Sequence, residues 1–315
     1  MTVYSSVLDI IGNTPMVDVS LLSPNPRVRI FAKLEGQNPG GSVKDRVALS
    51  MIEQAEKEGI LVPGSVLIEP SSGNTGIGLA MVCRMKGYRI KIVLPSNVSI
   101  ERKQLLALWG AEIIESPGSE GSNGAVRMAR RLADEHPEWV FLYQYGNPAN
   151  PRAHYEGTGP EIWRDVPAVT HFIGGLGTSG TLMGVGRFLK DRNPLVQVWA
   201  IEPPTGEMVD GLRNLDDGYI PPVFIDNNGF ELLDRKTVVG PRDSIEWTRR
   251  LIDVGIFAGI SSGAVMAGAA KCASSIDEGS IVVLLPDGGW KYLSTGAWTD
   301  DLDTVTERAK SIVYF

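Results

Sequence analysis

One lysine suggests a chemistry for this sequence. Lys44 lies in the glycine-rich segment 38–46, between an alternating stretch, Val28–Glu35, that predicts a strand and a stretch, Arg46–Lys57, with helical apolar spacing. A lysine held beside a tight turn at a helix start can form a Schiff base with an aldehyde. A surface lysine beside a helix start is the alternative, and this segment alone does not separate the two.

The segment Gly174–Thr181 predicts a phosphate site. It lies between a predicted strand and a predicted helix, and it is rich in glycine and in hydroxyl side chains. Successive N–H groups at a helix start bind anions, and glycine lets a phosphate approach the backbone. A glycine turn kept only for packing is the alternative.

The same segment also fits a nicotinamide dinucleotide. Residues 175–180 match G-x-G-x-x-G, and Glu202 ends the next predicted strand, where a ribose-binding carboxylate belongs. An NAD-dependent oxidoreductase is therefore a rival interpretation. The mid-chain position of the motif and its many hydroxyls count against this rival, which also leaves the segments at Asn38 and Ser71 unexplained.

Two further turns carry polar side chains at predicted helix starts. Ser71–Gly76 combines hydroxyls, an amide and free N–H groups, as a substrate carboxylate would need, although a plain N-cap is the alternative. Gly259–Gly263 is predicted to be a tight turn before an alanine-rich helix. A serine there caps the helix or hydrogen-bonds a pyridine nitrogen without protonating it fully.

The elements that must position these segments alternate between strand and helix. Two such runs, residues 65–144 and 171–286, predict βαβ units, and hence an α/β fold of two doubly wound halves. Ligands of such sheets bind outside the carboxyl ends of the strands. The loops expected to meet in one cleft begin at Asn38, Ser71, Gly174 and Asp287.

Composition excludes several other classes of protein. The 315 residues are 43% apolar and 21% charged, and the formal charge of −7 argues against nucleic-acid or membrane-surface binding. We expect no spanning helix and no signal peptide. Two cysteines, Cys83 and Cys272, provide neither a disulfide scaffold nor zinc spacing, so a reducing cytoplasm fits. Three scattered histidines suggest no metal site.

Taken together, these motifs resemble the fold-type II pyridoxal phosphate enzymes, and the cysteine synthase family in particular. The resemblance covers essentially the whole chain. It rests on residues 11–15, 38–46, 69–76, 144–150, 177–181, 259–263 and 292–295.

The resemblance implies a role for each matching position. Lys44 would hold pyridoxal 5'-phosphate as an internal aldimine and move the substrate α-proton as general base. Asn74 would contact the ring hydroxyl, and Ser261 would face the pyridine nitrogen. The cofactor phosphate would be bound by Gly177, Thr178, Ser179, Gly180 and Thr181. The substrate α-carboxylate would be bound by Ser71, Ser72, Thr75 and Gln144.

The resemblance also implies a reaction and a division into domains. The cofactor acts as an electron sink for β-replacement on an activated L-serine, through an aminoacrylate to which a sulfur nucleophile adds to give L-cysteine. A neutral serine at the ring nitrogen should favour β-elimination. Three-layer αβα domains would flank the active site: residues 36–147 the smaller, carboxylate-binding one, and 1–35 with 148–315 the larger, phosphate-binding one.

Two features differ from the common O-acetylserine enzyme and resemble the B-type cysteine synthases of actinobacteria, which use O-phosphoserine. Arg213 could bind a phosphate leaving group with two hydrogen bonds; a salt bridge with Asp210, Asp216 or Asp217 is the alternative. Residues 287–292 read Asp-Gly-Gly-Trp-Lys-Tyr in place of the usual segment. The short carboxy-terminal tail, residues 311–315, is also similar, and in those enzymes it can enter the active site.

The resemblance leaves the substrates partly open. B-type enzymes of other bacteria accept O-acetylserine with thiosulfate, so either donor fits. Sulfide, thiosulfate or a thiocarboxylated sulfur-carrier protein could supply the sulfur, and a homodimer is the usual assembly. Cystathionine β-synthase shares the fold and cofactor, although most such enzymes carry additional domains.

Overall fold

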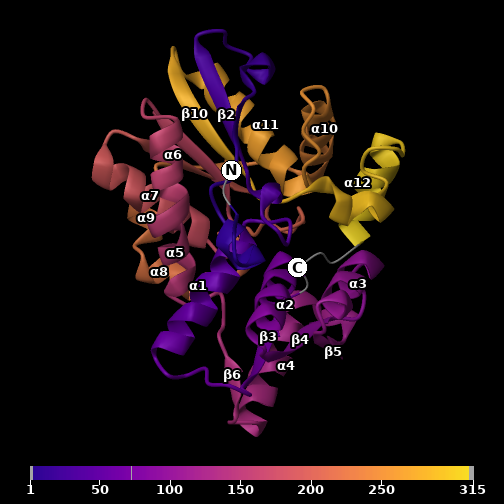
Figure 1. Cartoon of the computed structure of the whole chain (residues 1–315). Helices are drawn as coiled ribbons and strands as arrows, with labels where there is room; N and C mark the ends of the chain where they lie inside the picture. Colours follow the sequence, from indigo (N-terminus) through magenta and orange to yellow (C-terminus); the bar gives the residue numbers. More distant parts are fainter. Residues whose placement is uncertain (1–2, 72, 312–315) are drawn as a thin grey trace.

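Two sheets organise the chain in a computed structural model that describes residues 3–71 and 73–311 (Figure 1). The larger sheet comprises β1 (Met16–Asp18), β2 (Val28–Leu34), β7 (His171–Gly175), β8 (Gln197–Glu202), β9 (Arg235–Val238) and β10 (Gly279–Leu285). The smaller sheet comprises β3 (Val66–Pro70), β4 (Arg89–Pro95), β5 (Glu112–Ser116) and β6 (Trp139–Phe141).

Strand order makes both sheets doubly wound. The larger has the order β1-β2-β10-β7-β8-β9 and the smaller β5-β4-β3-β6. The pairs between these strands are parallel, except that β1 is antiparallel to β2. The central strands of such sheets are covered on both faces, so they read as continuous apolar runs; every residue of β3 is buried.

Helices connect the strands and cover the sheets. The smaller sheet is accompanied by α1 (Lys44–Lys57), α2 (Asn74–Lys86), α3 (Ile100–Leu108) and α4 (Gly121–Glu135). The larger is accompanied by α5 (Ala149–Ala153), α6 (Gly159–Asp165), α7 (Gly180–Arg192), α8 (Pro222–Asp226), α9 (Gly229–Leu232), α10 (Pro241–Ile252), α11 (Ile260–Ser275) and α12 (Leu302–Ser311). Figure 1 shows the two groups as the lower and upper parts of the molecule.

Two central helices are apolar on nearly all sides because protein surrounds them. Nearly all of α11 is buried, and it packs on the larger sheet between α10 and β10. Residues 75–83 of α2 are likewise buried, and α2 packs against α1. These helices begin at Ile260 and Asn74, so their first turns carry two of the predicted site residues into the interior.

A glycine sets how closely α10 approaches α11. A Cβ at Gly263 would lie 2.0 Å from the carbonyl oxygen of Ser244 and 2.1 Å from Oγ1 of Thr248, both on α10. Gly263 lies two residues after Ser261. The close packing of the two helices therefore also fixes the position of Ser261.

The structure confirms the predicted α/β fold with parallel sheets, but some elements begin or end at other residues than predicted. Residues 259–263 are not all turn, because α11 begins at Ile260 and includes Ser261. The strand predicted to reach Gln144 ends at Phe141. The sequence pattern did not predict the short edge strands β1 and β9. The domain limits, residues 36–147 and residues 1–35 with 148–315, remain a prediction.

Within residues 3–71 and 73–311, no helix combines the length and the apolar character needed to cross a bilayer.

We predict that Gly263→Ala destabilises the protein. The added methyl group would meet α10 at about 2 Å, and overpacking of this kind costs roughly 1–3 kcal/mol. Thermal unfolding of the cofactor-loaded protein should occur several degrees lower than in the wild type. Lys271→Ala, on the exposed side of the same helix, is the matched control and should leave the midpoint nearly unchanged. An unchanged midpoint for Gly263→Ala would show that α10 can move away freely.

Candidate active site

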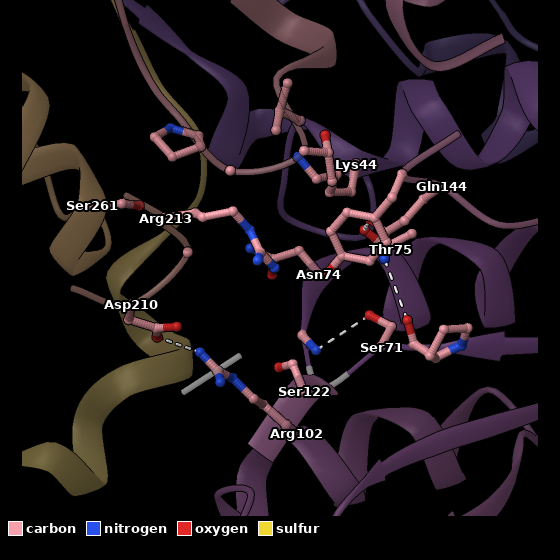
Figure 2. A pocket seen from close by; sticks show the side chains of 18 of the residues that line it. Lys44, Ser71, Asn74, Thr75, Arg102, Ser122, Gln144, Asp210, Arg213 and Ser261 are labelled. Carbon is pink, nitrogen blue, oxygen red and sulfur yellow. Dashed lines mark hydrogen bonds and ion pairs between the residues drawn. The ribbon is translucent and has the colours of Figure 1, made fainter. Parts of the chain in front are cut away.

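One cavity brings together loops from both sheets (Figure 2). Lys44 and Asn74 are the first residues of α1 and α2, while Ser261 lies in the first turn of α11 and Thr178 in the loop after β7. Pro286 follows β10 and also lines the cavity. The predicted meeting of these loops in one cleft is therefore confirmed.

Lys44 has an environment that favours its neutral amine. It borders the cavity, and protein encloses it on its other sides. This burial lowers the pKa of the Lys44 amine to about 8, although the carboxylate of Asp287 acts in the opposite direction. A larger neutral fraction makes the amine a better nucleophile for an aldehyde than an ordinary lysine.

The glycine-rich loop forms a cradle at the start of α7. Gly177, Thr178, Ser179 and Thr181 line a smaller cavity that shares Lys44 and Ser261 with the main one. Ser179 has a φ of +69°, and α7 begins at the next residue, Gly180. The first N–H groups of a helix have no intrahelical partner, so this end of α7 suits an anion.

Two positions of this cradle require glycine, because neighbouring atoms leave no room for a Cβ. A Cβ at Gly177 would lie 2.7 Å from the carbonyl oxygen of Gly211, so the two backbones nearly touch. A Cβ at Gly180 would lie 1.9 Å from Oδ1 of Asn150. The amide of Asn150 donates to Oγ1 of Thr178 at 3.1 Å and to the carbonyl of Gln144 at 2.9 Å. Gly180 thus makes room for a residue that fixes the cradle.

The loop before α2 combines capping with an open helix end. Oγ of Ser71 accepts hydrogen bonds from the N–H groups of Gly73 at 3.3 Å and Gly76 at 2.9 Å, so Ser71 satisfies one N–H group of the first turn of α2, although the N-cap residue is Gly73. Thr75 donates to Oε1 of Gln144 at 2.6 Å. Figure 2 shows Ser71, Thr75 and Gln144 around the same space. Ser72 lies outside the described residues.

Arg213 lies at the cavity beside two aromatic rings that also contact each other. Its guanidinium carbon is 4.7 Å from the centre of the Tyr219 ring and 5.6 Å from that of Tyr145. Its backbone N–H donates to the carbonyl of Leu176 at 2.6 Å. The rings restrict the side chain, which lines the cavity together with Gly177 and Gly211.

The three carboxylates considered as salt-bridge partners of Arg213 have other contacts. Asp210 forms a buried ion pair with Arg102 of α3. Asp216 lies 3.8 Å from Lys236, and Asp217 accepts from the N–H of Gly206. Burial raises the pKa of Asp210 to about 6, although the neighbouring Arg102 favours the charged form.

The structure adds residues that the sequence did not suggest. Arg102 and Asp210 line the cavity as an ion pair, and the end of β4 before α3 was the available signal for Arg102. His154 lies behind the phosphate cradle, with its Nε2 3.2 Å from Oγ1 of Thr181 and its Nδ1 3.0 Å from Oγ1 of Thr158. Burial holds the pKa of His154 well below its ordinary value, so the ring is neutral.

Comparison with known families decides whether the cofactor is pyridoxal phosphate or a nicotinamide dinucleotide. The family described as pyridoxal-phosphate dependent enzyme matches residues 7–287. Cysteine synthase B of Escherichia coli is 42% identical over 299 residues, which are 94% of this chain and 97% of the relative. The chain belongs to the pyridoxal-phosphate-dependent enzymes of the cysteine synthase family. This assignment decides against the nicotinamide interpretation of residues 175–180.

Solved structures agree with this family. The crystal structure of O-ureido-L-serine synthase has a TM-score of 0.88 and 37% identity, covering 94% of this chain and 96% of that one. O-acetyl serine sulfhydrylase isoform 3 from Entamoeba histolytica has a TM-score of 0.86 and 34% identity, covering 98% and 96%.

Pyridoxal 5'-phosphate is the cofactor of this enzyme, and the cavity fits it. An amine with a lowered pKa faces the cavity at Lys44, and a helix start built from glycines and hydroxyls adjoins it. The predicted residues Lys44, Asn74, Gly177, Thr178 and Ser261 all line the main cavity. Their individual roles remain proposals.

We predict that the cofactor-free protein captures pyridoxal phosphate with a pH dependence centred near 8. Only the neutral amine attacks the aldehyde, so the capture rate should rise as pH passes through the pKa of Lys44, about 8 rather than 10.5. Borohydride fixation after short mixing times measures the rate.

Two variants test the assignment of this pKa to Lys44. Lys44→Ala should retain no fixed cofactor. Asp287→Asn should move the midpoint to lower pH, because the carboxylate of Asp287 favours the ammonium form. A wild-type midpoint near 10.5 would contradict the assigned environment.

Proposed function

We propose that this enzyme is a cysteine synthase that uses O-phospho-L-serine as its preferred donor. The family and the relative at 42% identity support the synthesis of L-cysteine. The observation that carries the choice of donor is Arg213, whose guanidinium lies at the cavity that Lys44 and Ser71 also line. O-acetyl-L-serine is the second candidate donor.

Lys44 moves the protons of the reaction. Bound pyridoxal phosphate supplies an electron sink that makes the α-proton of an amino acid acidic. A pKa of about 8 leaves part of the Lys44 amine neutral near neutral pH, which suits a general base. Lys44 takes the α-proton before the bond from Cβ to the phosphate oxygen breaks. It returns the proton to Cα after the sulfur–carbon bond has formed.

The start of α2 binds the substrate α-carboxylate. Asn74 and Thr75, the first two residues of α2, line the cavity, and a negative group at a helix start is stabilised by roughly 0.3–1 kcal/mol or more. Thr75 donates to Oε1 of Gln144, and the amide nitrogen of Gln144 donates one hydrogen to the carbonyl of Pro70 at 3.4 Å, so its second hydrogen is the donor for the substrate. Ser71 holds this loop through its bonds to Gly73 and Gly76.

Arg213 receives the leaving phosphate. A guanidinium donates two parallel hydrogen bonds to a phosphate, and the leaving group gains negative charge as the bond to Cβ breaks. Tyr219 and Tyr145 hold the guanidinium in place, so little rotational freedom is lost on binding. Before the bond to Cβ breaks, an acetyl group carries no charge and offers one carbonyl oxygen, whereas a phosphate group already carries negative charge.

The sulfur source and the assembly complete the proposal. The nucleophile is sulfide, thiosulfate or a thiocarboxylated carrier protein, and the enzyme works as a cytoplasmic homodimer. Only sulfide gives free L-cysteine directly, because thiosulfate leaves a sulfonate group and a thiocarboxylate leaves an acyl group on the new sulfur.

One experiment tests the function. The purified, cofactor-loaded enzyme is mixed with sulfide and either O-phospho-L-serine or O-acetyl-L-serine, and L-cysteine is quantified. We expect kcat/KM to be at least about tenfold higher for O-phospho-L-serine, which corresponds to ~1.4 kcal/mol. If neither donor yields L-cysteine, the assignment as a cysteine synthase is wrong. A preference for O-acetyl-L-serine would overturn only the choice of donor.

We predict that Arg213→Ala lowers kcat/KM for O-phospho-L-serine by ~10- to 100-fold, because a charge-assisted hydrogen bond contributes about 1.5–3 kcal/mol. Turnover of O-acetyl-L-serine should hardly change. Arg187→Ala, which removes an exposed arginine of α7, is the control and should affect neither donor. Equal losses for both donors in Arg213→Ala would contradict the phosphate contact.

A further inference from the structure

Residues 287–292, which depart from the common form of the family, contain a charged clamp on Asn74. Nδ2 of Asn74 donates to Oδ2 of Asp287 at 2.8 Å, and Nζ of Lys291 donates to Oδ1 of Asn74 at 2.6 Å. Asp287 and Lys291 are 2% and 1% exposed, so neither bond is open to competition from bulk water. We call these two side chains the Asn74 clamp.

The clamp permits only one orientation of the amide. An ammonium group can only donate hydrogen bonds and an ionised carboxylate can only accept them, whereas an amide can rotate to exchange its oxygen and nitrogen. With Lys291 at one end and Asp287 at the other, a rotated amide would place its N–H groups against the Lys291 ammonium and its oxygen against the Asp287 carboxylate. Buried mismatches of this kind are strongly unfavourable.

The clamp is itself held rigidly. Tyr292 donates its hydroxyl to Oδ2 of Asp287 at 2.6 Å, and Lys291 also donates to the carbonyl of Gly41 at 3.2 Å. The backbone carbonyl of Asp287 accepts from the N–H of Gly259, directly before α11. The clamp is therefore joined to the loop of Lys44 and to the start of the helix that carries Ser261.

The amide retains one group for a ligand. Asn74 lines the cavity beside Lys44, and its nitrogen carries two hydrogens, of which Asp287 takes one. Its oxygen is occupied by Lys291. Asn74 therefore offers a donor, not an acceptor, to whatever binds next to it.

We propose that Asp287 and Lys291 are positioning residues that act through Asn74 to stabilise the deprotonated ring oxygen of bound pyridoxal phosphate. This inference rests on the proposed contact between Asn74 and that oxygen. A fixed N–H donor favours an oxygen that accepts, which is the phenolate form. Without the clamp the amide can turn its oxygen toward the ring, which favours the protonated form.

The test compares the visible absorption of the bound cofactor, which reports its protonation state, in holoenzyme variants. Lys291→Met keeps the apolar length of the side chain and removes the ammonium group. We expect a change in the visible band and a rise of ~10-fold or more in the apparent dissociation constant of the cofactor by equilibrium dialysis, as loss of a hydrogen bond to a charged group implies. Lys291→Gln, which keeps a donor, should move both readouts less, and it replaces Lys291→Met if that variant does not fold.

A double-mutant cycle shows whether Lys291 acts through Asn74. Asn74→Ala should change the band by itself, and adding Lys291→Met to it should then have little further effect. An unchanged band in Asn74→Ala would overturn the contact of Asn74 with the ring oxygen. A full effect of Lys291→Met in the Asn74→Ala background would overturn the clamp alone.

The matched control is Lys86→Met. Lys86 is a partly buried lysine at the far end of α2 from Asn74, where it pairs with Glu56 at 2.8 Å. Its loss should leave the visible band unchanged. The same spectral change in Lys86→Met as in Lys291→Met would mean that the loss of any paired lysine has this effect, and the clamp would be wrong.

Discussion

A buried ion-pair network at Arg46 fixes where the reactive lysine lies. The Arg46 guanidinium donates to Glu35, at the end of β2, and to both carboxylate oxygens of Glu161 on α6. Lys33 completes the network through Glu161. Removing one partner from such a network costs about 3–5 kcal/mol, because the remaining charge is left buried. Arg46 is two residues after Lys44, so these bonds attach the start of α1 to the larger sheet.

The other side of α1 belongs to the smaller sheet. Val47, Ala48 and Met51 pack into the apolar core that α2 shares with β3 and β4. Ion pairs thus hold α1 to the larger sheet, and apolar contacts hold it to the smaller one. Lys44 consequently lies where the two halves meet, and it lines one cavity with Asn74 of α2 and a smaller one with the phosphate cradle of α7. The same position buries the amine, which is the physical cause of its lowered pKa.

Local patterns predicted the parts of the site that are local in sequence. A helix start after a glycine-rich loop is visible in a few residues, which is why Lys44 and residues 177–181 were found. The partners of these groups are not local. Arg102 and Asp210 are 108 positions apart, and Asn74 and Lys291 are 217 positions apart. Nothing in either segment alone specifies such a pair, so these contacts required the fold.

The charges around the cavity differ from those of the whole chain. The chain carries a formal charge of −7, which by itself gives no reason to expect an anionic substrate. At the cavity, however, two arginines, Arg102 and Arg213, face the carboxylate of Asp210, and α2 and α7 begin there with the positive ends of their dipoles. Because these charges act through protein as well as solvent, their field is screened less than that of exposed side chains. The local field at the cavity therefore favours an anionic ligand, which the net charge of the chain does not indicate.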